Sequence, residues 1–208
     1  MRTDKHQIRR ANSARLIAEE KRRTRKIRIT VGSAVVIGIA ALTGGGWALT
    51  SALQDKQRSH VIEGVKVWSD LSRNHTKKPV HYPMSPPVGG DHNPVWLKCM
   101  GTVYAKPVRD ENAVHSLEHG AVWVTYTDKA SETDVKALKK KVASTTYTMI
   151  SPYKGQKSPI TLTAWGHQLN VSRADDPRVD KFFKEYIQGK QTPEPMASCS
   201  GGYMRKAP

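Results

Sequence analysis

The sequence predicts an α+β protein with an N-terminal transmembrane helix, a loop-rich segment, and a body ordered strand-helix-strand-strand-helix. Three observations predict this arrangement: an uncharged run near the N-terminus, a segment rich in proline and glycine, and alternating strand and helix patterns after residue 120. The body's order is that of the second half of a thioredoxin-like fold, which other α+β sandwiches share. With 208 residues, the chain can form one modest domain plus appendages.

The first 28 residues form a basic arm, which precedes an apolar run. The arm holds eleven Lys or Arg and three Asp or Glu, so its net charge of +8 is half of the chain's +16. Residues 29–53 carry no charge, and 25 helical residues can cross a hydrocarbon core of about 30 Å. We therefore predict a single-pass membrane helix. A cleaved signal peptide is the alternative, because small residues lie near Ala52. However, the basic arm and the apolar run are both longer than the corresponding regions of a signal peptide usually are.

The charge of the arm also predicts the orientation of the chain. The positive-inside rule places residues 1–28 in the cytoplasm, and residues 61–208 outside it, as an extracytoplasmic α+β domain behind a polar linker at 54–60. We expect a protein of the cell membrane whose arm contacts anionic lipids and which has a membrane-protein partner. We expect no nucleic-acid binding, because the arm has neither interleaved aromatic residues nor a DNA-binding motif.

A proline- and glycine-rich segment follows a short strand predicted at 61–68. Residues 80–94 contain four prolines and two glycines, which exclude a helix or a central strand. The segment carries His81, Met84 and His92, and imidazole with thioether suits copper, above all Cu(I). The apolar residues that follow at 96–104 favour an ordered loop packed against a core.

Two histidines and a carboxylate lie within five residues, in the order His115, Glu118, His119. On a helix, His115 and His119 project from one face, and imidazole and carboxylate are ligands of zinc and copper. The spacing also matches H-x-x-E-H, the inverted zincin motif. A buried, hydrogen-bonded corner without metal is the alternative.

Beyond Gly120, strand and helix patterns alternate. β-branched and aromatic residues predict strands at 121–127, 145–150 and 160–165. Ser131 is a good N-cap for one helix, and Pro177 begins a second helix that Gly189 ends. We expect the strands at 145–150 and 160–165 to pair with each other as antiparallel neighbours, because their connection is short.

The two cysteines of the chain, Cys99 and Cys199, lie on the outer side in this topology. Outside the cytoplasm such a pair predicts one disulfide, which could stabilise the fold by about 4 kcal/mol in the entropic model. Thiolate ligands in a copper site and free thiols remain alternatives. Since no C-x-x-C pair is present, redox chemistry of the thioredoxin type is disfavoured.

Several short segments together form a signature. They are PPVGGDH at 86–92, GTVY at 101–104, PV at 107–108, VHSLEHG at 114–120, TAWG at 163–166 and PEP at 193–195. This signature resembles bacterial domain-of-unknown-function family 3105, whose members carry a membrane anchor and often come from actinobacteria. The resemblance covers about residues 60–202, with Gly89 in place of the family's commoner serine. It implies a site at His92, His115, Glu118 and His119, and no particular reaction.

These observations predict a membrane-anchored module that binds copper or zinc through His92, His115 and His119, with Glu118 orienting an imidazole. One alternative is a structural or accessory subunit of a cell-envelope complex without metal. Another is an H-x-x-E-H metallohydrolase, which is disfavoured because Pro107 and the strand at 121 leave room for little more than one helical turn. We therefore expect a binding module more than an enzyme.

Overall fold

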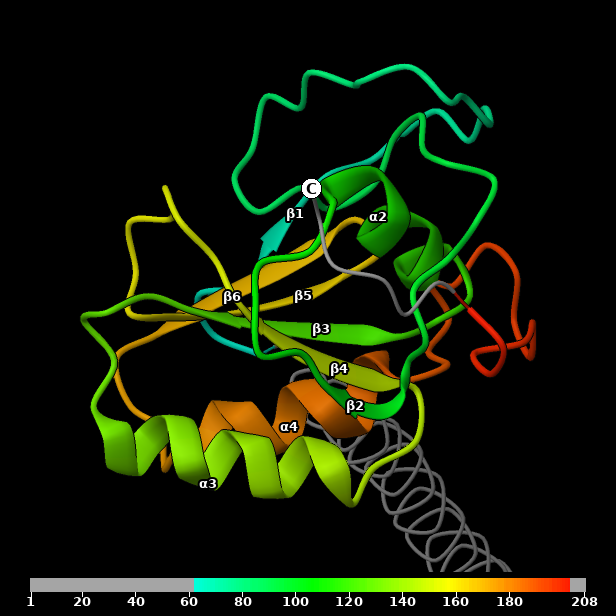
Figure 1. Cartoon of the computed structure of the whole chain (residues 1–208). Helices are drawn as coiled ribbons and strands as arrows, with labels where there is room; N and C mark the ends of the chain where they lie inside the picture. The colour runs from blue at the N-terminus through cyan, green and yellow to red at the C-terminus, as the bar shows by residue number, and fades with distance from the viewer. Residues whose placement is uncertain (1–61, 203–208) are drawn as a thin grey trace, which may run out of the picture. The chain divides into compact units, whose positions relative to one another are not determined.

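The computed structural model describes residues 62–202, which form a six-stranded mixed sheet with helices on both faces (Figure 1). The sheet order is β1-β6-β5-β3-β4-β2. The strands are β1 (Lys66–Val67), β2 (Met100–Val103), β3 (Val122–Tyr126), β4 (Thr148–Pro152), β5 (Ile160–Ala164) and β6 (His167–Val171). The helices are α2 (Asp110–Glu118), α3 (Glu132–Ala143) and α4 (Pro177–Tyr186). The predicted α+β class of the body is confirmed.

The predicted arm at 1–28, membrane helix at 29–53 and linker at 54–60 lie outside the described residues. Within residues 62–202, no helix is both long enough and apolar enough to cross a bilayer. The membrane anchor therefore stays a prediction.

In the middle of the sheet, helix α3 connects two parallel strands, β3 and β4. β5 pairs antiparallel with β3 and continues through a tight turn into β6. The expected pairing of 160–165 with 145–150 is therefore wrong. The connection at 153–159 crosses back over the end of β3, where Tyr153 N–H donates to Tyr126 O and Thr127 N–H donates to Pro159 O.

Two strands have no counterpart in the sequence prediction. β6 has polar residues at three of its five positions, which hides the strand pattern, and Gly166 makes the turn before it. Gly166 has φ 67°, and a Cβ there would lie 2.8 Å from Trp68 O. β2 is short and contains Gly101, so its own residues favour a strand only weakly. Its pairing with β4 is the main reason that this segment is extended.

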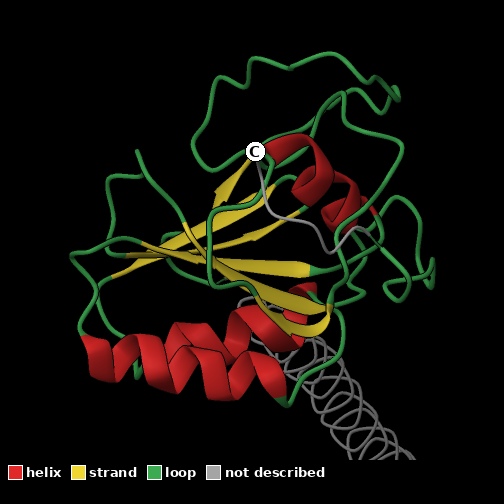
Figure 2. Ribbon diagram, viewed as in Figure 1, coloured by secondary structure: helices red, strands yellow, loops and turns green. Residues whose placement is uncertain are grey.

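The sheet separates two hydrophobic cores. α3 and α4 cover one face and α2 covers the other (Figures 1 and 2). β3 serves both cores, because Val122 and Val124 pack in the α3–α4 core whereas Trp123 packs in the α2 core. Burying each such side chain contributes about 1.5–3 kcal/mol. The packing fixes α2 over the sheet, and with it the residues of the predicted motif.

Helix α2 has nine residues, about two and a half turns, whereas the sequence predicted room for little more than one turn. It begins two residues after Val108, and Glu111 in its first turn can interact favourably with the positive end of the helix dipole. Its apolar side consists of Ala113, Val114 and Leu117. The longer helix therefore places His115 and Glu118 within regular helical geometry.

The predicted disulfide joins Cys99 to Cys199, with a Cα–Cα distance of 4.9 Å. Both residues are buried in the α2 core, and Cys99 N–H donates to Cys199 O at 3.0 Å. The bond ties the C-terminal segment to the segment that precedes β2. Neither thiol is then available as a metal ligand.

Candidate metal centre

Four potential metal ligands converge from three segments of the chain. Their ligand atoms all lie within 4.8 Å of one another, and the residues are His75, His92, His115 and Glu118. His75 and His92 come from two loops that pair as a short parallel bridge, where Thr76 N–H donates to His92 O and His92 N–H donates to Asn74 O. His115 and Glu118 are three residues apart on α2 and so share one helical face.

The centre contains one buried pair of polar atoms that the fold leaves unsatisfied. His92 Nε2 and Glu118 Oε2 lie 2.9 Å apart, and both side chains are almost completely buried. The pair does not meet the geometry of a hydrogen bond, and neither atom has a hydrogen-bond partner among residues 62–202. A buried polar atom without a partner costs about 1–3 kcal/mol. A cation that binds both atoms would remove this cost.

The proton positions on three imidazoles follow from their backbone contacts. Nδ1 lies 2.7 Å from Gly90 O in His92, 2.6 Å from Asn93 O in His115, and 2.7 Å from Ser198 O in His119. A carbonyl oxygen can only accept, so each Nδ1 carries a hydrogen, and each Nε2 offers a lone pair whenever its ring is neutral. Metal-binding histidines commonly have such a partner, which fixes the orientation of the ring.

Electrostatics put the α2 ligands in the protonation states that metal binding requires. Burial lowers the pKa of His115 to about 4, and the neighbouring imidazoles add to this effect, so the ring is neutral at pH 7. Burial by itself would raise the pKa of Glu118. The contacts from His92 and Arg73 outweigh it and lower this pKa to about 2, so the carboxylate is ionised. Arg73 Nε donates to Glu118 Oε1 at 2.8 Å and leaves Oε2 facing His92.

The segment that carries Asn93 is fastened directly to α2. Ser116 Oγ accepts from Leu97 N–H and donates to Leu97 O, both at 2.9 Å, and Asn112 Nδ2 donates to Val95 O. These contacts hold the carbonyl that orients the ring of His115. The lone pair of His115 is therefore preorganised before any ion arrives.

His119, predicted as a third ligand, lies beside the group of four and not within it. Its ring is 4.5 Å from that of His115, and its Nε2 is 3.7 Å from Glu194 Oε2. The regular helix ends at Glu118, and the contact with Ser198 O draws the ring of His119 toward the C-terminal segment. Burial lowers its pKa as well. Glu118, predicted to orient an imidazole, contacts His92 and is also one of the four candidate ligands.

His75 is the candidate ligand that sequence reasoning missed. It lies in a polar stretch with no motif around it, and its side chain is 49 % exposed. Its ring stacks on that of His115 at 4.9 Å and meets that of His92 edge-on at 5.0 Å. Since the other three ligands are buried, His75 forms the solvent-facing side of the centre.

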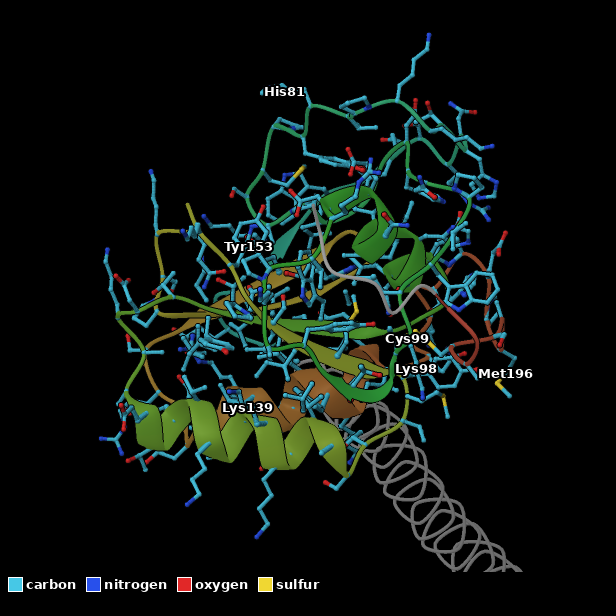
Figure 3. The ribbon with its side chains drawn as sticks, in the orientation of Figure 1. His81, Lys98, Cys99, Lys139, Tyr153 and Met196 are labelled. Atoms are coloured by element: carbon cyan, nitrogen blue, oxygen red, sulfur yellow. A yellow bond between two sulfur atoms is a disulfide. The ribbon has the colours of Figure 1, made fainter. Side chains whose placement is uncertain are left out.

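The other predicted copper ligands lie elsewhere. Met84 lines a separate hollow together with Trp68 and Gln168. His81 is exposed on the outer loop (Figure 3). The group of four therefore contains no sulfur donor, which argues against Cu(I).

The family model for proteins of unknown function DUF3105 matches residues 74–201. The chain belongs to this family. The match includes all four ligands and both cysteines. No curated protein and no solved structure matches the chain.

Three imidazoles and one carboxylate fit a tetrahedral ion in this DUF3105 chain. Bonds of about 2.0–2.1 Å would place the ligand atoms about 3.4 Å apart, so the widest present separation of 4.8 Å must contract by about 1.4 Å. His75 is exposed and lies on a loop, so it can supply much of this movement. The donor set suits zinc or Cu(II), as borderline ions that accept imidazole nitrogen and carboxylate oxygen.

Proposed function

We propose that this DUF3105 protein is a membrane-anchored, extracytoplasmic module that holds one zinc or Cu(II) ion between His75, His92, His115 and Glu118. The observation that carries the proposal is the buried pair His92 Nε2 and Glu118 Oε2, which face each other at 2.9 Å without a hydrogen bond. A bound cation gives both atoms a partner and accounts for the fixed tautomers around them.

The proposed location rests on the charge pattern of the N-terminus and on the disulfide. The uncharged run at 29–53 behind a basic arm is what an anchor with a cytoplasmic N-terminus requires. A buried disulfide is usual for proteins outside the cytoplasm. The arm would then contact anionic lipids, and a membrane protein is the expected partner.

The strand order supports a thioredoxin-like body as part of the proposal. Parallel β3 and β4 joined by α3, followed by an antiparallel hairpin and a helix on the same face, match the second half of such a fold. The cysteines are 100 residues apart and joined to each other, so the proposal includes no dithiol chemistry.

The geometry favours holding an ion over hydrolysis. Four protein ligands complete a tetrahedral shell, as in structural zinc sites, whereas a catalytic ion keeps a position for water. In an H-x-x-E-H hydrolase both histidines bind the ion and the glutamate activates water. Here Glu118 faces His92 and is paired with Arg73, so it is not free to act as that base.

Metal analysis of the full chain, purified without a His-tag, tests the proposal. We expect about one zinc or copper ion per chain in wild type, and loss of most of it in His92→Ala and His115→Ala. His81→Ala is the matched control, because His81 is exposed on the same loop and lies outside the centre. If metal-free wild-type protein takes up neither zinc nor copper, the proposal is refuted. The alternative of a buried polar corner without metal would then be favoured.

A further inference from the structure

A second hollow of the molecule lies at the other end of β3. A cleft of about 990 Å³ opens where the parallel strands β3 and β4 end, at Tyr126 and Pro152. The first turns of α3 and the loop after β4 form its walls. β3 starts beside the end of α2 and runs toward the start of α3 (Figure 1), so its length of roughly 13 Å separates this cleft from the metal centre.

The cleft combines an apolar interior with a surplus of positive charge. Its lysines are Lys129, Lys136, Lys139 and Lys154, whereas its acids are Asp128 and Glu132. Within residues 62–202 none of these four ammonium groups has a carboxylate partner; the Nζ of Lys139 instead lies 5.6 Å from the centre of the Tyr126 ring. Among the described residues the cleft therefore keeps a surplus of positive charge, four lysines against two acids.

The aromatic walls of the cleft are held in place. Tyr153, which faces the cleft after β4 (labelled with Lys139 in Figure 3), donates from its hydroxyl to Asp110 Oδ2 at 2.9 Å. The buried side chain of Gln156 accepts from the Thr125 hydroxyl at 2.6 Å and donates to Ser158 O at 2.9 Å. These bonds fix both ends of the loop after β4, so the cleft is formed without a ligand, as binding sites usually are.

We propose that this cleft binds a small amphipathic anion, a free molecule with an aromatic or other apolar body and a carboxylate or phosphate head. The ring of Tyr126, beside the Nζ of Lys139, supplies flat apolar surface for the body, and Tyr153 lines the cleft from the loop after β4. Lys136 and Lys139 lie on one side of α3 and can reach the head. The volume is within the range of about 300–1,000 Å³ that is usual for small-molecule sites.

The proposal can be tested with three naphthalene probes that share one body. Naphthoate and naphthyl phosphate carry anionic heads and naphthylmethylamine carries a cationic head. Each is titrated into the full chain in phosphatidylcholine nanodiscs, with empty nanodiscs as the blank, and binding is followed by calorimetry. We expect saturable binding of at least one anion and none of the amine; which anion binds more tightly identifies the head.

Variants then locate the binding. Lys136→Gln with Lys139→Gln should weaken anion binding by about 5–10-fold, since each exposed ion pair contributes little. Lys140→Gln with Lys181→Gln is the matched control, because it removes the same charge from exposed helical lysines outside the cleft and should change the Kd less than twofold. Absence of saturable anion binding, equal binding of the amine, or equal weakening in the control pair would overturn the proposal.

Discussion

Replacing Glu118 with glutamine separates a metal centre from a structural corner by the sign of its effect. Glutamine keeps the shape of the side chain and can still accept from Arg73 Nε, which lies 2.8 Å from Oε1. Its amide can also donate to His92 Nε2, which has no hydrogen-bond partner in the wild-type structure. We therefore expect metal-free Glu118→Gln to melt at the same temperature as metal-free wild type or above it.

With metal the order reverses. Zinc at 100 to 1,000 times its Kd would stabilise wild type by about 2.7–4.1 kcal/mol. For a domain of this size that corresponds to a rise in Tm of roughly 8–20 °C. Glu118→Gln loses the charged ligand, so we expect its affinity to fall at least about 10–100-fold and its zinc-induced rise to shrink by about a third or more.

The assay is a set of melting curves with chelator, with zinc and with copper. Glu111→Gln is the matched control, because Glu111 is also buried on α2 but accepts from Val80 N–H and lies outside the centre. It should lower stability and leave the metal-induced rise intact. Two results together would contradict the metal centre: a Tm of Glu118→Gln below that of wild type in chelator, and a wild-type Tm that no metal changes. They would show that Glu118 and His92 form an ion pair instead.

Two other predictions concern the fold. Reduction of the Cys99–Cys199 bond should lower the free energy of unfolding by about 2–4 kcal/mol, because the bond closes a loop of 100 residues; urea melts with and without reductant would show it, and equal midpoints would contradict it. Burial raises the pKa of Asp110 from 3.8 to about 6, although the hydrogen bond from Tyr153 lowers it. The fold therefore favours the protonated carboxyl. The stability that this group contributes is fully present below pH 3.8 and is lost as the pH rises through about 6. Asp110→Asn should therefore stabilise the chain by about 1–2 kcal/mol at pH 7.5 and hardly at pH 4, both measured in chelator, and a gain independent of pH would contradict this.

The elements that the sequence predicts well are those with local signals. Ser131 accepts from Asp134 N–H at the start of α3, and Asp176 accepts from Arg178 N–H at the start of α4, as helix caps do. β3 is recognisable because it is buried on both faces. By contrast, β2 and β6 exist through their neighbours in the sheet, and composition alone did not indicate them.

The same distinction applies to the candidate centre. His115 and Glu118 could be found because a helix brings together residues three apart, whatever the rest of the fold does. The choice between His119 and His75 could not be predicted locally. It depends on the end of α2 and on the bridge between two loops, which joins residues 17 positions apart in the chain.

The assembly of the centre from separate segments has a thermodynamic consequence. His75, His92 and α2 are brought together only when the loops pair and α2 packs on the sheet, so the unfolded chain offers no equivalent site. Metal binding would then contribute its free energy to folding, and most strongly to the loop that carries His75. This loop has the one half-exposed candidate ligand and few buried apolar residues, so an ion would stabilise it more than the other segments of the centre. His75 is therefore the ligand through which an ion would enter and leave the centre.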